Sequence, residues 1–325
     1  MYDVITIGSA TRDVFLISKK FKFLRSDEFE TGIGECVSFG SKIELDELVV
    51  TSGGGGTNAA VTFARLGCKT AVVTRIGTDG TGRDLLEELA REHVDTSLIT
   101  QVKKAHTGYS TILTAPNGER SILVDRGVSK TFKKTDLPLT KLKASWIYLT
   151  SLGGDLSLAL VIAKHAHKHH IKLAYNPGMA EVARGLRAME PILRHVTLLS
   201  LNVEEAQRLT GLETRDIKTL AARILRPAQT LIITDGQNGA YAFQNDVQLF
   251  IRGRNIPAVS RTGAGDAFGS GVVAGLMKGW NVKESLKLAL LNAESVIKYY
   301  GAKRGILSRF PSTASRASIS VKSFS

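Results

Sequence analysis

The residues best placed to do chemistry lie in the stretch 261–271, which reads RTGAGDAFGSG. Gly263 and Gly265 allow a tight turn and leave the main-chain amides uncovered, and the apolar segment that follows predicts a helix. Free N–H groups at a helix start attract anions, and the helix dipole adds to this attraction. Asp266 would stand beside such an anion. Its carboxylate could take a proton from a hydroxyl nucleophile while the amides hold the charge of a transferred phosphoryl group.

A second interpretation gives this stretch no catalytic role. An acidic residue in the first turn of a helix stabilises the dipole, and glycines allow close packing. On this stretch alone both interpretations stay open, so the rest of the chain must decide between them.

Two further candidates lie near the amino terminus. Asp13 follows the strand-like run 2–8, and open α/β sheets bind ligands beyond the carboxyl ends of their strands. Glycines at 53–56 lead into the predicted helix 59–66, so a ligand can approach the backbone closely there, and Asn58 can both donate and accept hydrogen bonds. Asp13 could therefore accept hydrogen bonds from substrate hydroxyl groups, or it could simply form a turn.

Two later strand ends carry similar polar residues. Asn202 can cap the helix that follows, and Glu205 stands three residues on, which is typical of a capping box. The loop 234–239, TDGQNG, could hold a phosphate tail or could turn directly into the strand 240–243. A purely structural role would therefore also explain these residues.

The elements that position these residues alternate between strands and helices from Thr70 onward. Alternation over this length predicts a doubly wound, mostly parallel sheet between two layers of helices. Residues 14–50 and 106–126 break the alternation, and their short strands with an Asn117-Gly118 turn predict an inserted small β-sheet that forms a lid. The predicted strands are 70–76, 146–150, 171–175, 196–201 and 230–234, and the predicted helices are 82–92, 156–168, 179–188, 203–209, 218–225 and 282–300.

Length and composition are typical of one large globular domain. The chain has 325 residues, 43% of them hydrophobic, and no apolar run reaches the ~20 residues of a membrane span. We expect the domain to cover residues 1–310 and the polar tail 311–325 to be disordered. Two cysteines form no disulfide framework and no leader precedes the first strand, so we expect a cytoplasmic location and no membrane partner.

The formal charge of +13 raises the question of a nucleic-acid partner. The basic residues are dispersed and no nucleic-acid-binding motif is present, so we expect no specific nucleic acid. The sequence also lacks G-x-x-x-x-G-K-[ST] and a complete G-x-G-x-x-G. This argues against P-loop enzymes and against nicotinamide-dependent dehydrogenases.

Two stretches resemble the signatures of the ribokinase-like (PfkB) carbohydrate kinases. GGGGTNAA at 53–60 with ARLG at 64–67 is similar to their amino-terminal signature, and TGAGDAF at 262–268 with Gly271 to their carboxyl-terminal one. The resemblance covers roughly residues 2–308 and implies a three-layer αβα fold with a small inserted β-sheet lid. Asp13 precedes both signatures, and Asn202 with Glu205 and Thr234 with Gly236 and Gly239 fall between them, all in the expected order.

The resemblance implies an enzyme that phosphorylates a hydroxymethyl group of a sugar, sugar derivative or nucleoside, with ATP as co-substrate and Mg²⁺ as cofactor. Asp266 would be the general base, and the amides of Gly263, Ala264 and Gly265 would form the anion hole. Glu205 would hold Mg²⁺ through water. The acceptor would be bound by Asp13, Gly54, Asn58 and Asn176, and the nucleotide by Asn202, Thr234, Gly236, Gly239 and Asn292.

The same resemblance implies a lid that closes to exclude water and that can pair with a second lid in a homodimer. Three positions depart from the family pattern. Ser260 stands where many members carry an Asp of a monovalent-cation site, Arg261 where many carry Thr, and the run 150–153, TSLG, lacks the Glu of ribokinases proper. Potassium activation and ribose as the acceptor are therefore open, and an inactive sugar- or nucleotide-binding protein of the same fold remains the alternative.

Overall fold

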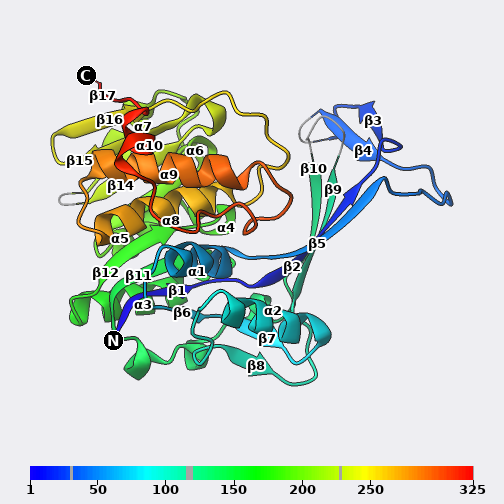
Figure 1. Cartoon of the computed structure of the whole chain (residues 1–325), viewed down its shortest axis with the longest axis horizontal. Helices are drawn as coiled ribbons and strands as arrows, with labels where there is room; N and C mark the ends of the chain where they lie inside the picture. Colours follow the sequence, from blue (N-terminus) through cyan, green and yellow to red (C-terminus); the bar gives the residue numbers. More distant parts are fainter. Residues whose placement is uncertain (30–31, 115–119, 227–228, 325) are drawn as a thin grey trace.

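The computed structural model describes residues 1–29, 32–114, 120–226 and 229–324. Its centre is a large mixed sheet (Figure 1). Six neighbouring strands of this sheet, β6, β1, β11, β12, β13 and β14, pair in parallel. The strands β15, β16 and β17 extend the sheet beyond β14 with antiparallel pairing. In spatial order the sheet contains β17 (Val321–Ser323), β16 (Val247–Ile251), β15 (Ala240–Gln244), β14 (Thr230–Thr234), β13 (Leu198–Asn202), β12 (Lys172–Asn176), β11 (Ala144–Thr150), β1 (Tyr2–Ile7) and β6 (Thr70–Val73).

Helices cover both faces of this sheet. One face carries α1 (Gly55–Arg65), α8 (Ala264–Met277) and α9 (Val282–Val296), which share an apolar core with Val4 and Tyr148. The other carries α3 (Leu156–Lys168), α5 (Gly185–Leu193), α6 (Val203–Thr210) and α7 (Ile217–Ile224), packed around Ile5, Ile7 and Leu149. Successive residues of one strand thus enter different cores, which explains the continuous apolar runs in the sequence. The predicted doubly wound three-layer fold is confirmed.

The lid is a second sheet that projects from the body of the molecule (Figure 1). Its strands, in spatial order, are β10 (Arg120–Asp125), β9 (Gly108–Thr114), β2 (Thr11–Ile17) and β5 (Glu47–Gly53), with the hairpin β3 (Lys22–Arg25) and β4 (Ile33–Cys36) between β2 and β5 in the chain. Both predicted insertions contribute to it, and the predicted Asn117-Gly118 turn lies outside the described residues. The lid sheet extends to Thr11 and Gly53, beyond the expected limits of 14 and 50.

Two predicted elements divide in the structure. The strand 70–76 becomes β6 and β7 (Arg75–Gly77), which pairs with β8 (Thr100–Val102) outside the central sheet. The helix 179–188 becomes α4 (Met179–Val182) and α5, because Gly185 adopts a φ of +79° that an α-helix does not accommodate.

The described residues of the tail are ordered, contrary to the disordered tail 311–325 predicted from composition. They form α10 (Thr313–Ala317) and β17, which pairs with β16 at the sheet edge. The Arg316 guanidinium pairs with Glu284 of α9 and lies 4.1 Å from the centre of the Trp280 ring. These partners are distant in the sequence, so local composition could not reveal them.

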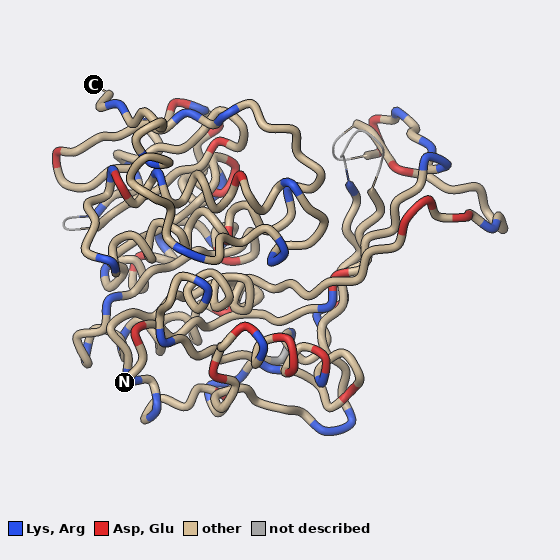
Figure 2. The backbone as a smooth tube through the Cα atoms, in the orientation of Figure 1, with Lys and Arg blue, Asp and Glu red and all other residues tan. Residues whose placement is uncertain are grey.

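No helix among the described residues has the length and apolarity needed to cross a bilayer. Lysines and arginines are spread over both the body and the lid (Figure 2). This distribution agrees with the dispersed basic residues of the sequence.

Candidate active site

The start of α8 forms the centre of the candidate site. Gly263 is its N-cap residue with a φ of +81°, and a Cβ atom there would lie 2.3 Å from the Cβ of Ala302. Only glycine therefore fits this turn without strain. Ala264 and Gly265 follow as the first helical residues, so their N–H groups have no carbonyl within the helix to bond, and Ala264 N–H makes a long hydrogen bond of 3.3 Å to the Arg261 carbonyl oxygen before the turn. The turn thus presents main-chain donors at the positive end of the helix dipole.

Asp266 does not point into the apolar interior. Its carboxylate lines a cavity of about 210 Å³, together with Gly263 and Gly265. Asn58 of α1 donates a hydrogen bond from Nδ2 to Asp266 Oδ2 at 2.8 Å. Burial raises the pKa of Asp266, and the Asn58 hydrogen bond and the charge of Lys303 oppose this shift. The Asp266 side chain thus lies in the same cavity as the turn that carries the main-chain donors.

Asp13 lies at the base of the lid, on β2. It is 5% exposed, and Oδ1 accepts a hydrogen bond from Thr11 Oγ1 at 3.0 Å. Burial raises the pKa of Asp13, while hydrogen bonds from Thr11 and Ser110 and the charge of Lys303 lower it. A Cβ atom on Gly53 would lie 1.9 Å from Asp13 Oδ2, so the signature glycine leaves room for this carboxylate.

The other amino-terminal signature residues fix α1 against the base of the lid. Gly54 has a φ of +94°, and a Cβ atom there would lie 2.4 Å from the carbonyl oxygen of Ser9. The Asn58 side chain is 4% exposed, and its Oδ1 has no hydrogen-bond partner within the described part of the chain. A buried amide oxygen without a partner costs free energy, so it suits a hydroxyl donor from a ligand.

Asn176, Asn202 and Glu205 line the same 210 Å³ cavity as Asp266. The Asn176 Nδ2 atom donates to the carbonyl oxygen of Ser200 at 2.9 Å, which orients the amide at the end of β12. Asn202 and Glu205 form the predicted capping box: Glu205 N–H donates to Asn202 Oδ1 at 2.7 Å, and Asn202 N–H donates to Glu205 Oε2 at 2.9 Å. Asn202 and Glu205 therefore cap α6 and also line the cavity.

The Glu205 carboxylate is suited to a magnesium site. Burial raises its pKa to about 7, and the nearby charge of Asp266 adds to the shift, against the hydrogen bond from Asn202. A cation beside it would offset this repulsion. Mg²⁺ binds oxygen ligands and commonly uses one or two carboxylates together with substrate phosphates. The residues present therefore fit Mg²⁺ held by Glu205 directly or through water.

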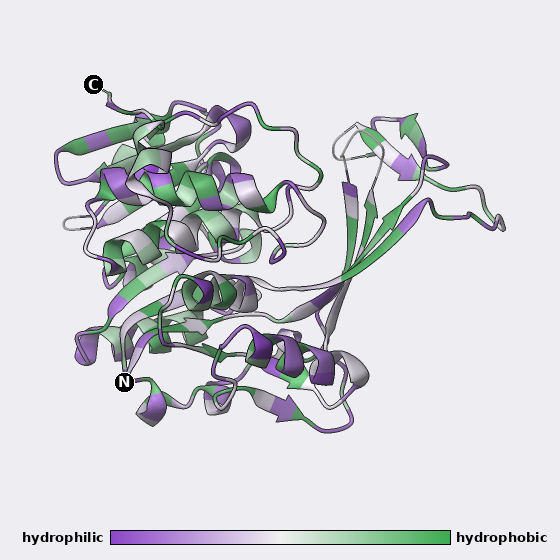
Figure 3. Cartoon of the chain, viewed as in Figure 1, coloured by the Kyte–Doolittle hydropathy of each residue, from purple (hydrophilic) through white to green (hydrophobic). Residues whose placement is uncertain are grey.

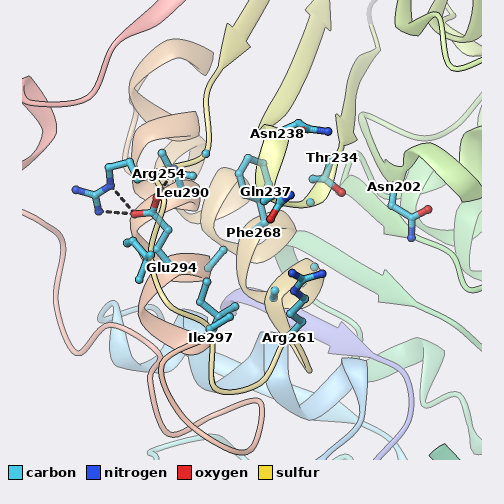
Figure 4. A pocket seen from close by; sticks show the side chains of 18 of the residues that line it. Asn202, Thr234, Gln237, Asn238, Arg254, Arg261, Phe268, Leu290, Glu294 and Ile297 are labelled. Atoms are coloured by element: carbon cyan, nitrogen blue, oxygen red, sulfur yellow. Dashed lines mark hydrogen bonds and ion pairs between the residues drawn. The ribbon is translucent and has the colours of Figure 1, made fainter. Parts of the chain in front are cut away.

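A larger cavity of about 1080 Å³ adjoins the smaller one (Figure 4). Asn202, Thr234 and Gly265 line both cavities, so the two meet at the start of α8. The loop after β14 contributes Gly236 and Gly239. Gly239 has a φ of +120°, and a Cβ atom there would lie 2.0 Å from the Ile251 carbonyl oxygen. That close approach explains why the loop requires glycine.

Asn292 does not reach either cavity. It is fully buried, its Nδ2 donates to the Ala267 carbonyl oxygen at 2.9 Å, and its Oδ1 accepts from Leu307 N–H at 3.0 Å. The amide thus ties α9 to α8 and to the loop that follows α9. The larger cavity is lined instead by Leu290 and Ala293 of the same helix, so we leave Asn292 out of the nucleotide site.

Sequence reasoning missed two charged residues of this region. Glu294 of α9 lines the larger cavity and accepts from Arg254 Nε at 2.7 Å and from Arg254 N–H at 3.1 Å (Figure 4). Lys303, 5% exposed, follows α9 in the chain. Neither belongs to a motif, and a lone charge in or after an amphipathic helix carries no sequence signal of burial. Arg261, which the sequence did single out, is exposed and lines the larger cavity.

Comparison with known proteins agrees with this geometry. Residues 1–308 match the pfkB family carbohydrate kinases. A sugar kinase of Archaeoglobus fulgidus, itself uncharacterised, is 30% identical over 247 residues, which cover 75% of this chain and 97% of that protein. A ribokinase of Haemophilus influenzae is 28% identical over 266 residues, covering 80% of this chain and 85% of its own.

The fold also has solved counterparts. The crystal structure of a ribokinase from Cryptococcus neoformans var. grubii serotype A in complex with ADP superposes with a TM-score of 0.74. The two chains are 22% identical, and the match covers 94% of this chain and 97% of that one. The Asn58–Asp266 hydrogen bond joins the two signatures, the family model matches nearly the whole chain, and its relatives include named kinases, so this chain belongs to the pfkB family of carbohydrate kinases.

Proposed function

We propose that this protein transfers the γ-phosphoryl group of ATP to a hydroxymethyl group of a sugar, sugar derivative or nucleoside, with Asp266 as the general base. The observation that carries the proposal is the meeting of two cavities at the start of α8. Asp266 lines the smaller cavity, and the turn residues Gly263, Ala264 and Gly265 lie where the two cavities meet. An acceptor and a nucleotide bound on either side would thus face each other across one anion site.

The larger cavity suits the nucleotide. Its volume of about 1080 Å³ exceeds what a sugar needs, and the loop with Gly236 and Gly239 offers backbone groups for the phosphates. Asn202 and Thr234 lie where this cavity joins the smaller one, next to the site proposed for the γ-phosphate. The Cryptococcus neoformans ribokinase of the same fold was solved with ADP, which supports an adenine nucleotide as one of the two ligands.

The acceptor would lie between the base of the lid and the start of α8. Asp13 supplies a buried carboxylate that can accept from two hydroxyl groups, and Asn58 Oδ1 can accept from one. The backbone of Gly54 and the amide of Asn176 would complete the pocket on either side. This set recognises several hydroxyl groups at once, which suits a carbohydrate or the ribose of a nucleoside.

In the proposed reaction the acceptor hydroxyl gives its proton to Asp266 as its oxygen forms a bond to the γ-phosphorus. The bond between that phosphorus and the bridging oxygen breaks, and ADP leaves with the electron pair. The amides of Gly263, Ala264 and Gly265 hold the oxygens of the transferred group. Mg²⁺, held by Glu205, would neutralise phosphate charge when bound. Closure of the lid would exclude water, which would otherwise compete as the acceptor.

A donor and acceptor screen tests this function. With MgATP, the protein should release ADP only when a suitable acceptor is present, and mass spectrometry should show a phosphorylated product. The panel should contain pentoses, hexoses, hexose phosphates, keto-acid sugars and nucleosides, and chelation of Mg²⁺ should abolish turnover. Stabilisation by ligands without ADP release would favour an inactive binding protein. Thermal stabilisation by NAD but not by ATP would overturn the proposal.

We also propose that the lid pairs with the lid of a second copy. Strand register places Leu48, Val50 and Leu123 on the face of the lid sheet opposite Asp13, and these side chains are 57%, 51% and 61% exposed. Figure 3 shows the corresponding hydrophobic segments along the lid strands. An apolar face that does not face the acceptor matches an identical face on a second copy, because a twofold interface is self-complementary.

The double variant Leu48→Asp with Leu123→Asp is expected to convert a dimer into a monomer, because both copies would bury four carboxylates without partners. Light scattering coupled to size exclusion measures the mass, which should fall to the 35.1 kDa of one chain. Val247→Asp, at an exposed position in β16 outside the lid, is the control and should leave the mass unchanged. A monomeric wild-type protein would contradict this proposal.

A further inference from the structure

Lys303 is a buried basic residue beside the candidate site. Its ammonium donates a hydrogen bond to Ser52 Oγ at 2.6 Å and lies 3.9 Å from Glu88 Oε1. Ser52 in turn donates to Glu88 Oε1 at 2.6 Å. Burial disfavours a lysine charge, and burial does lower the pKa of Lys303, against the attraction of nearby carboxylates. A buried lysine keeps its proton only where nearby negative charges compensate for the lost hydration of the ammonium group.

The loop that carries Lys303 is held on three sides. A Cβ atom on Gly301 would lie 2.7 Å from Thr51 Cγ2, so the loop packs closely against β5. The next residue, Ala302, packs against Gly263 at the start of α8. The guanidinium of Arg65, at the end of α1, donates to the carbonyl oxygens of Lys303 and Ile306 at 2.9 Å each. These contacts fix the ammonium relative to the anion site and to the base of the lid.

Carboxylates surround this ammonium from several elements. It is attracted by Glu88 and Glu92 of α2 (Gly80–Arg91, with Glu92 as its C-cap) and by Asp13 of β2 and Asp266 of α8. Glu92 is also paired with Arg65, whose Nη2 lies 2.6 Å from Glu92 Oε1.

Asp266 has other charged and titratable neighbours. Asp13 raises the pKa of Asp266 by like-charge repulsion, and Asp266 interacts in turn with Glu205 of α6 and with Tyr148 of β11. Lys303 is the cation that opposes these effects, since its charge lowers the pKa of both Asp13 and Asp266. Without this cation, several buried carboxylates would repel one another, and at least one would take up a proton.

We propose that Lys303 is a positioning residue whose ammonium keeps Asp13 and Asp266 ionised towards the acceptor, an inference that rests on the proposed kinase function. Asp266 can accept a proton from the acceptor only as a carboxylate, and Asp13 accepts the most hydrogen bonds in that form. Lys303 touches neither the acceptor nor the nucleotide in this arrangement. Lys303 influences Asp13 and Asp266 only through its positive charge.

The pH dependence of kcat in neutral variants of Lys303 tests this inference. Lys303→Gln keeps a donor for Ser52 but removes the charge, so Asp266 should take up its proton at higher pH. The acid limb of kcat should then move to higher pH, with a loss of about tenfold at pH 6 and less than about threefold at pH 9. Lys303→Arg, which restores a cation, should return the limb towards its wild-type position.

The control is Ser52→Ala, which removes the hydrogen bond but keeps the ammonium. Its acid limb should stay at the wild-type pH, whatever its stability. If Lys303→Gln does not fold, as judged by circular dichroism and ADP-induced stabilisation, Lys303→Met replaces it as the neutral variant. If kcat of the folded neutral variant falls by the same factor at every pH, Lys303 has only a structural role and the inference is overturned. A wild-type protein that phosphorylates no acceptor would instead refute the proposed function itself.

Discussion

Replacing Asp266 by asparagine is expected to lower kcat by about 10²- to 10⁴-fold, which is the usual contribution of a general base. Asparagine has nearly the same shape and can still accept the hydrogen bond that Asn58 donates at 2.8 Å. It cannot take a proton from the acceptor. Steady-state kinetics with the acceptor identified by the screen would measure the loss, and ATP binding should stay close to that of the wild type.

The same substitution should stabilise the free protein at alkaline pH. Burial raises the pKa of Asp266 in the folded state. Ionisation of Asp266 therefore lowers the free energy of unfolding. This destabilisation is complete above the pKa of the folded state and absent below the pKa of the unfolded state. Asp266→Asn should thus raise Tm at pH 8 and leave it nearly unchanged near pH 4.

Asp246→Asn, at an exposed position in the turn between β15 and β16, is the matched control and should change neither kcat nor Tm. An undiminished kcat in Asp266→Asn would remove Asp266 from the role of base.

Gly263→Ala is expected to lower kcat by about 10²-fold or more, because the main-chain donors of the anion site would move. The new Cβ atom would lie 2.3 Å from Ala302 Cβ and 2.7 Å from Ala302 Cα, and the residue has a φ of +81°. The turn must shift to relieve this overlap. Loss of one well-placed donor to a developing oxyanion typically costs 10²- to 10³-fold in kcat. The larger cavity would still bind ATP, so the nucleotide KM should change far less than kcat.

Gly211→Ala separates backbone strain from the loss of the anion site. Gly211 ends α6 with a φ of +72°, and its Cβ atom would meet nothing within 4 Å. Tm should fall by a few degrees while kcat stays within about twofold of the wild type. A Gly263→Ala variant with wild-type kcat would contradict the proposed role of the turn.

Much of the fold could be predicted from the sequence because local pattern and tertiary role agree. Each buried parallel strand is an apolar run that ends in polar residues, and the signature glycines stand where a Cβ atom would collide, as at Gly53, Gly54 and Gly263. The prediction for α3, 156–168, has the bounds of the observed helix. The cytoplasmic location predicted from the cysteines and the N-terminal residues stays a prediction.

What the sequence could not predict depends on partners distant in the chain. The tail is mostly small and polar, but its described residues pair with β16, place Arg316 against α9 and bury Ile319 and Val321 in the core. Asn292 looks like a candidate ligand for a base until its two hydrogen bonds to Ala267 and Leu307 are seen. The burial of Lys303 likewise follows from the packing of β5, α1 and α8 around one loop.

The position of Asp13 on a lid strand has a consequence for how affinity is measured. Asp13 belongs to β2, whereas Asn58 and Asp266 belong to helices of the body. A carbohydrate held by all three joins the two parts of the molecule, so its dissociation constant includes the free energy of bringing them together. Substitutions confined to residues 8–10, which connect β1 of the body to β2 of the lid, would then change the apparent affinity without touching the bound molecule. An acceptor analogue that lacks the group bound by Asp13 would likewise lose affinity through this free energy as well as through the missing contact.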